Sequence, residues 1–234
     1  MTQRYGKAAA MAGLLLAATV SGCMTDGKGF SSYASNLVAD KVDPAPLPSA
    51  FHYCHSHGCE DRSLLSLTGA QWRDATWRLI PEPGSAAEER QRLAWAVADF
   101  ETVVAAETGT ESDVGGSFAG FGRSGQLDCV DESLNMTMFL RMLEGQGLLR
   151  FHRPSQPVTK GTLIDGWPHY SATMIELASG QHYTLDSWYF DNGEPALVLR
   201  RETWLSKLED LITCMRDGAE DAQVRKSPAE CGYS

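Results

Sequence analysis

Hydrophobic residues recur at the spacing of an amphipathic helix in three stretches of the chain. The first follows Ser85, which forms a capping box with Glu88 three residues later, and it ends at Thr108-Gly109-Thr110. The second follows Asp128, a plausible N-cap, and stops at Gly145 and Gly147. The third lies near the C-terminus. The apolar positions of the first stretch are Leu93, Ala96, Val97, Phe100, Val103 and Val104. Those of the third stretch are Trp204, Leu205, Leu208, Leu211, Ile212 and Met215.

Three segments in the C-terminal half predict β-strands, at His169 to Leu177, His182 to Tyr189 and Ala196 to Leu199. Ser179-Gly180 and Asp191-Asn192-Gly193 supply the turns between them. Upstream, 148–152 resembles a strand start, and Pro154, Pro157 and Gly161 predict a loop that runs to residue 168. Residues 64–80 predict a short strand and then a turn or helix. The expected fold is α+β, with a helical layer packed on an antiparallel sheet.

The first 22 residues have the pattern of a signal peptide. Arg4 and Lys7 precede a short apolar run at 8–20, which is too short to span a bilayer comfortably. Because the run ends in Val-Ser-Gly-Cys, it resembles a bacterial lipoprotein signal, and that resemblance implies lipidation of Cys23. An ordinary secretory signal cut nearby is the alternative. Met24 after Cys23 favours the outer membrane, facing the periplasm.

Residues 23–50 are rich in Ser, Asp, Gly and Pro and predict a flexible tether, which leaves 51–234 as one domain. The formal net charge of −10 argues against binding to nucleic acid or to anionic lipid through charge. Attachment to the membrane would therefore depend on the acyl chains. The oligomeric state does not follow from the sequence.

Four of the six cysteines form two local groups, Cys54 with Cys59 and Cys214 with Cys231. In an oxidising compartment such pairs are plausible disulfides, and Cys129 is then the free thiol. The segment 51–60, FHYCHSHGCE, also suggests a zinc or copper site. Because no second Cys/His cluster completes a shell, a disulfide loop with exposed histidines is favoured and no metal or cofactor is expected.

Cys129 opens the second predicted helix, where the helix dipole favours thiolate over thiol. His169 and Asp186 follow on neighbouring predicted strands, and their parity in a hairpin puts them on the same sheet face. A two-residue turn at Ser179-Gly180 would offset them by four residues, so a longer loop is needed to bring them together. With Cys129 as nucleophile, the backbone N–H of Cys129 and the side chain of Gln126 are the candidate oxyanion donors.

Each of these residues also has a structural interpretation. Cys129 suits a buried core position, His169 a strand end and Asp186 a turn. The acidic neighbours Asp131 and Glu132 disfavour a thiolate, since like charges raise its pKa.

Three segments together resemble the transglutaminase-like cysteine peptidase superfamily, in its bacterial periplasmic branch related to papain: DCVDESLNMTMFLRMLEGQGLL, PHYSATMIEL and GQHYTLDSWYFDNG. The resemblance covers about residues 126–199. It implies a papain- or transglutaminase-like core in which Cys129, His169 and Asp186 form a catalytic triad without a cofactor. The implied activity is hydrolysis or acyl transfer at amide bonds of a peptide or protein substrate in the cell envelope. A catalytically inactive lipoprotein that uses the same fold to bind a partner is the alternative.

Overall fold

The computed structural model describes residues 41–116, 123–161, 168–217 and 226–233. The predicted signal peptide, Cys23 and most of the predicted tether lie outside these residues. The described elements, in chain order, are β1 (Phe51–His55), β2 (Asp61–Leu65), α2 (Gly69–Thr76), the 3-10 helix η1 (Trp77–Leu79), α3 (Ala86–Thr108), α4 (Cys129–Gly145), β3 (His152–Lys160), β4 (His169–Glu176), β5 (His182–Asp186), β6 (Leu197–Arg200) and α5 (Arg201–Arg216). The fold is thus mixed, with helices and an antiparallel sheet as predicted, and it has in addition a two-stranded sheet, β1–β2, that was not predicted.

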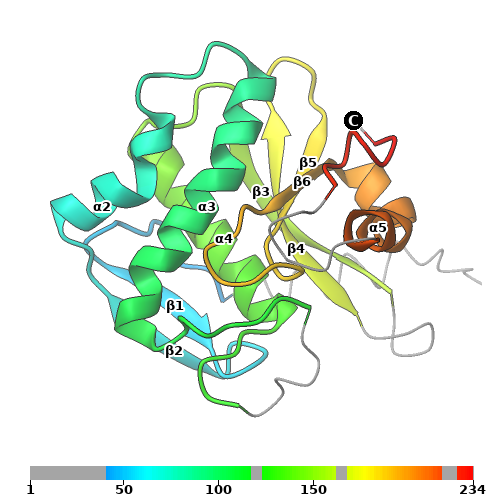
Figure 1. Ribbon diagram of the computed structural model, residues 1–234. Helices are drawn as coiled ribbons and strands as arrows, with labels where there is room; N and C mark the ends of the chain where they lie inside the picture. The colour runs from blue at the N-terminus through cyan, green and yellow to red at the C-terminus, as the bar shows by residue number, and fades with distance from the viewer. Residues whose placement is uncertain (1–40, 117–122, 162–167, 218–225, 234) are drawn as a thin grey trace, which may run out of the picture.

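The larger sheet has the order β3-β4-β5-β6, and every neighbouring pair is antiparallel. Because side chains alternate along a strand, the sheet has two distinct faces. One face, with Ala172, Met174 and Leu185, belongs to the main core with α3 and α4. The other face, with Leu197 and Leu199, packs on α5. Figure 1 shows α4 and α5 on opposite sides of the strands.

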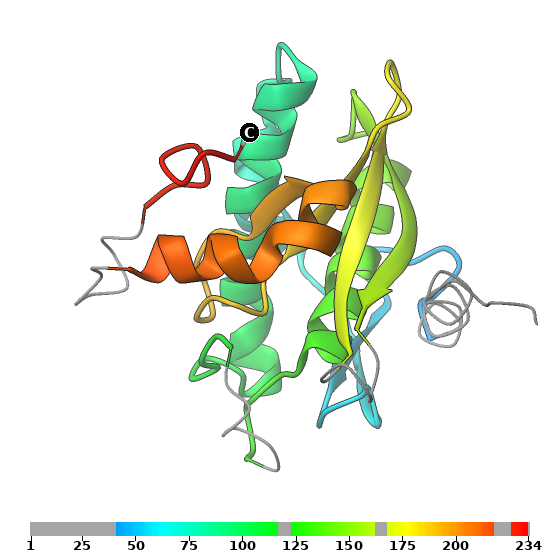
Figure 2. The same cartoon turned by 90° about the vertical axis from the view of Figure 1, so that its right-hand side faces the viewer.

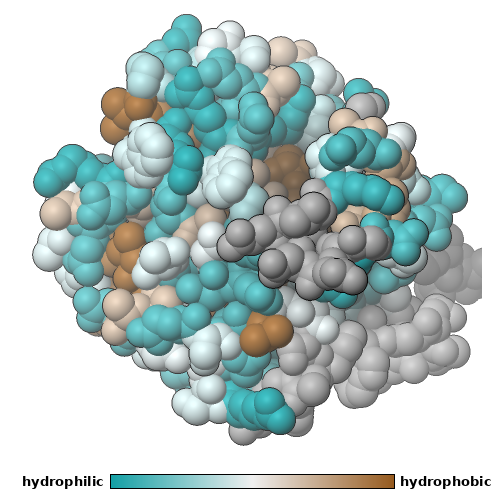
Figure 3. All heavy atoms as spheres, viewed as in Figure 1, coloured by the Kyte–Doolittle hydropathy of each residue, from teal (hydrophilic) through white to brown (hydrophobic). Residues whose placement is uncertain are grey.

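The main core is centred on the contact between α3 and α4. The rings of Phe100 and Phe139 stack with centroids 4.3 Å apart, and both are fully buried. Such an aromatic pair contributes roughly 0.5–1.5 kcal/mol beyond its buried area. Ser85 caps α3 by accepting from the N–H of Glu88, and Gly109 ends it in the left-handed conformation. Figure 3 shows a mostly hydrophilic face over α2 and α3 on which hydrophobic residues form separate small patches.

Strand β3 corrects the first part of the loop predicted from Pro154 to residue 168, of which residues 162–167 lie outside the described ranges. Pro154 and Pro157 lie within it, and its pairing with β4 shifts between Ser155 and Val158. Since β3 is an edge strand, one side of its backbone has no strand to pair with, so a missing N–H is tolerated there. Proline predicts the end of a central strand but not of an edge strand.

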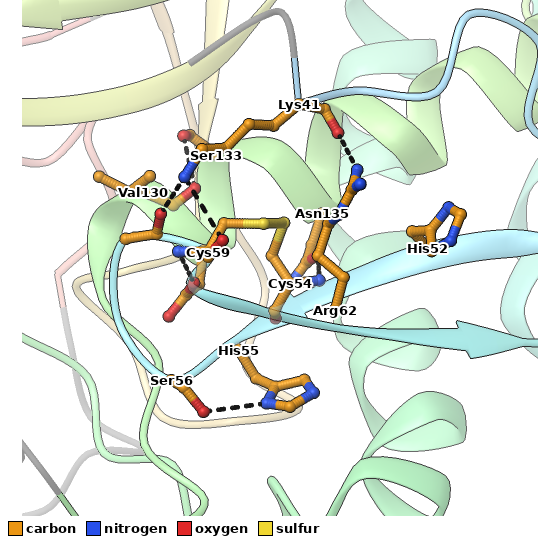
Figure 4. Close-up of a disulfide and its surroundings, with 12 residues drawn as sticks. Lys41, His52, Cys54, His55, Ser56, Cys59, Arg62, Val130, Ser133 and Asn135 are labelled. Carbon is orange, nitrogen blue, oxygen red and sulfur yellow. Dashed lines mark hydrogen bonds between the residues drawn. A yellow bond between two sulfur atoms is a disulfide. The ribbon is translucent and has the colours of Figure 1, made fainter. Parts of the chain in front are cut away.

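The segment FHYCHSHGCE forms β1 and the turn of the β1–β2 hairpin, which a disulfide between Cys54 and Cys59 closes (Figure 4). Asn135 of α4 lies beside this disulfide. Its side chain accepts from the N–H of Cys54 at 2.7 Å and donates to the carbonyl of Cys54 at 3.0 Å. The hairpin is thereby attached to the middle of α4.

Residues 41–50, predicted as the end of the tether, are packed on this domain. Val42 is buried, the Lys41 ammonium donates to the carbonyl of Gly58 at 2.6 Å, and Arg141 donates to the carbonyl of Asp43 at 2.7 Å. The packed domain therefore extends at least to Lys41, ten residues earlier than predicted.

The C-terminal segment 226–233 folds back beside α5 (Figure 2). The predicted disulfide between Cys214 and Cys231 joins the two, with Cα atoms 6.0 Å apart. Cys231 and Tyr233 pack against the α5 cluster. The end of α5 is thus fixed at both its packed face and its disulfide.

Candidate active site

Cys129 is the first residue of α4 and the free cysteine of the described chain. Asp128 caps the helix by accepting from the N–H groups of Val130 and Asp131. The Cys129 sulfur lies 3.8 Å from the carbonyl oxygen of Pro168, the residue before His169. The thiol at the N-terminus of α4 therefore lies next to the start of β4.

The disulfide hairpin holds this end of α4 in place. The turn between β1 and β2 donates three backbone N–H groups to the two capping carboxylates: His57 and Cys59 to Asp131, at 2.9 and 2.7 Å, and Gly58 to Asp128 at 2.9 Å. Carboxylates that accept backbone N–H groups retain charge with less penalty in a buried place. The segment that suggested a metal site thus serves as a clamp for the helix that carries Cys129.

His169 and Asp186 meet on the face of the sheet that packs on α5. The Nε2 atom of His169 lies 2.8 Å from Oδ2 of Asp186, and both side chains are buried. The parity prediction is confirmed. The sequence leaves the register open, and the structure settles it: the N–H of Glu176 donates to the carbonyl of Gln181, so the loop is longer than Ser179-Gly180. Extending the register from the Ala172–Leu185 pair gives an offset of two residues, a diagonal contact within reach.

Trp204 completes the surroundings of this pair. Its indole Nε1–H donates to the same Oδ2 of Asp186 at 2.6 Å, and its ring stacks on His169 with centroids 5.4 Å apart. Trp204 is fully buried in α5. The sequence predicts it only as a core residue of an amphipathic helix, since a helical stripe does not reveal which member carries a hydrogen bond.

A cavity of about 750 Å³ opens where Cys129 and His169 meet α5. The Nδ1 atom of His169 is buried and has no hydrogen-bond partner among the described residues. With Nε2 engaged by Asp186, Nδ1 is the ring nitrogen left for the thiol or a substrate. The described residues that line the cavity are Gly116, Cys129, Lys160, Gly161, Pro168, His169, Trp188, Tyr189, Leu205, Glu209, Ile212, Thr213 and Arg216.

The electrostatics of the site oppose a resting thiolate. Burial raises the pKa of the Cys129 thiol far above its ordinary value, and the charges of Asp128, Asp186 and Glu132 raise it further. The expectation that the helix dipole makes Cys129 a thiolate is therefore not met. A proton on sulfur must leave before or during any attack.

Glu132 belongs to a buried group of carboxyls behind the site. Its carboxyl accepts a hydrogen bond from Ser187, the residue after Asp186, and thus ties α4 to the end of β5. Burial is the largest cause that raises the pKa of Glu132, of Asp113 and of Glu101, the last to about 8. Contacts between Glu132 and Asp113 link these carboxyls further. Protonated members of this group donate hydrogen bonds and avoid the cost of buried charge.

Gln126 is occupied elsewhere. Its Nε2 atom donates to the carbonyl of Ser112 at 2.7 Å, its Oε1 atom accepts from the N–H of Val114, and it does not line the cavity. Binding an oxyanion would require this amide to leave Ser112. The backbone N–H of Cys129, at the first turn of α4, needs no such change.

The remaining histidines and acids of the described ranges form no cluster that could hold a metal ion. His52 pairs with Asp43, and His55 contacts Ser63 and Ser56. His152 is buried against Glu89, at the opposite end of β3 from Lys160. Within the same ranges, no helix has both the length and the apolar character needed to span a bilayer.

Comparison with known proteins adds no relative: no protein-family model, no curated protein and no solved structure matches this chain.

Proposed function

We propose that this protein is a thiol-dependent hydrolase or acyltransferase that acts on amide bonds of a peptide-like substrate, on a transglutaminase-like core. The proposal rests on one observation: His169 is bound to Asp186 through Nε2, its buried Nδ1 has no hydrogen-bond partner among the described residues, and His169 and Cys129 line the same cavity. Nucleophile, base and orienting carboxylate are thus available in one place.

The raised pKa of the Cys129 thiol favours general-base catalysis over a preformed ion pair. In the proposed reaction His169 Nδ1 takes the thiol proton as Cys129 Sγ bonds to the carbonyl carbon. The imidazolium then gives that proton to the leaving amine, and a thioester remains on Cys129. Water or a second amine attacks the thioester with the same proton transfers in reverse order. Asp186 orients the ring and stabilises its positive form.

Location in the cell envelope belongs to the same proposal. The lipoprotein-like signal that ends at Cys23 and the two disulfides of the described chain both suit an oxidising, extracytoplasmic compartment. A lipid on Cys23 would attach the domain to the membrane through the segment that precedes Lys41.

A pool of fluorogenic peptide amides tests the activity. The wild type is expected to cleave or transfer at least one peptide, and Cys129→Ala and His169→Ala each to lower kcat/KM by more than about a hundredfold. Trapping the thioester on Cys129 and locating it by mass spectrometry identifies the nucleophile. Ser133→Ala, which alters α4 away from the cavity, is the control and should retain activity.

The second candidate is an inactive envelope protein that uses the cavity to bind a partner. The observation in its favour is the raised pKa of Cys129, since a protonated, buried thiol is a poor nucleophile. It predicts no turnover by the wild type and equal peptide binding by wild type and Cys129→Ala.

A further inference from the structure

One face of α5 forms part of the cavity wall. Leu205, Glu209, Thr213 and Arg216 line the cavity at helical spacing, and the adjacent stripe with Trp204 and Leu208 is buried in the core. A ligand in the cavity must therefore lie along this face of α5, and the charges on the face bear on which ligands fit.

Lys160 brings one positive charge to the cavity. It is the cross-strand partner of His169, and its ammonium lies 2.9 Å from a carboxylate oxygen of Glu209. Because this pair is close to neutral, Lys160 by itself does not make the cavity favour an anionic ligand.

Arg216 brings a second positive charge to the cavity, and no carboxylate of the described ranges pairs with it. Its guanidinium donates to the carbonyl of Tyr189 at 2.9 Å, and within the described ranges it forms no ion pair. It lies against Gly116, where an added Cβ would be 2.9 Å from its terminal nitrogen. The glycine thus lets the guanidinium rest close to the loop, and the bond to Tyr189 fixes it.

A fixed guanidinium with unused N–H donors matches the planar oxygens of a carboxylate. Among the described residues that line the cavity, two are cations and one is an anion, in a chain whose formal net charge is −10. In a chain of negative net charge, these two lining cations are the groups that favour an anionic ligand in the cavity.

We infer that the cavity recognises a carboxylate of the peptide substrate through Arg216, with Glu209 acting as a competitor for Lys160. That the ligand is a peptide rests on the proposed function. The carboxylate comes either from an acidic side chain near the reacting amide or from the free C-terminus of the peptide.

Binding to the Cys129→Ala protein tests the inference without requiring turnover. Three peptides of one sequence are titrated calorimetrically: one with an internal Glu and an amidated end, one with Gln in its place, and the Gln peptide with a free C-terminal carboxylate. We expect one carboxylate peptide to bind about tenfold more tightly than the neutral Gln peptide, an advantage that falls with added salt. The peptide with the advantage identifies the source of the carboxylate.

Variants on α5 give effects of opposite sign. Arg216→Gln should remove the tenfold advantage, whereas Glu209→Gln should increase it several-fold because Lys160 is released. Lys207→Gln is the matched control: it removes one positive charge from the same helix at an exposed position outside the cavity lining. A destabilised helix weakens binding of all three peptides and does not tighten any.

Equal binding of all three peptides, no measurable binding of any, or an Arg216→Gln variant that behaves like Lys207→Gln overturns the inference. Failure of the proposed function has a different result. In that case the carboxylate preference persists, but the wild type turns over none of the peptides.

Discussion

At the scale of single residues, the carboxylate of Asp186 is the most constrained group in the site. Its Oδ2 atom lies 2.8 Å from Nε2 of His169 and accepts a hydrogen bond from Nε1–H of Trp204 at 2.6 Å. We predict that Trp204→Phe keeps a ring against His169 but lowers kcat by roughly tenfold with KM nearly unchanged, because a positioning bond is lost. Steady-state kinetics on a cleaved peptide measure this split.

A purely structural role for Trp204 would give another result. The low-field NMR resonance of the His169 ring N–H reports the bond to Asp186 and should shift in Trp204→Phe. Trp72→Phe, at a half-buried tryptophan that packs edge-on against Phe139 in the main core, is the control and should leave the resonance in place. Unchanged kcat and an unchanged resonance would contradict a positioning role.

The contact between His169 and Asp186 could be predicted from the sequence to the extent that strand parity allows. Alternation fixes the face of each residue, so one shared face was foreseeable, but the offset depends on loop length, which alternation does not fix. No pattern in the sequence indicated that Lys160 and Arg216 would line the same cavity. Their role depends on which elements meet at the cavity, and this is a property of tertiary packing.

At the scale of elements, one buried carboxylate joins α3 to the larger sheet. Glu89 accepts from the N–H groups of Arg150 and Phe151 and lies 2.8 Å from Nδ1 of His152, with both side chains fully buried. We predict that Glu89→Ala destabilises the protein by about 3 kcal/mol, because it leaves buried donors without an acceptor. Chemical denaturation measures the loss.

The matched control for this change is Glu107→Ala, at an exposed position of the same helix. It should cost less than about 0.5 kcal/mol. If both variants lost the same stability, the effect would belong to helix propensity and not to the junction between α3 and β3.

Elements whose signals are local were predicted well. The ends of α4 follow from Asp128 as cap and from the glycines near its end, which need no knowledge of the rest of the fold. Strand β3 was missed because its prolines are tolerated only at a sheet edge, and edge position is decided by the order of strands. The packing of residues 41–50 depends in the same way on the distant partners Gly58 and Arg141.

At the scale of the whole molecule, the buried carboxyls Glu101, Asp113 and Glu132 connect α3, the segment before α4, and α4 itself. Each is about 5 % exposed, and burial is the largest cause of the raised pKa of each. A carboxyl whose pKa is higher in the folded than in the unfolded chain binds its proton more tightly when folded. The cluster therefore stabilises the fold most below the unfolded pKa of about 4.3, and that contribution is lost as pH rises.

For Glu101 the loss extends from about pH 4.3 to the folded pKa of about 8. We predict that the Tm of the wild type falls between pH 6 and pH 9 and that Glu101→Gln, which has no proton to lose, reduces this fall by roughly 3–5 °C. The negative charge of the whole chain also grows with pH, but Glu107→Gln on the exposed side of α3 removes the same charge and should leave the fall unchanged. If plots of Tm against pH were parallel for all three proteins, the pH dependence would come from the overall charge. If the plot for Glu101→Gln alone is flatter, the dependence comes from the proton that the buried Glu101 carboxyl binds.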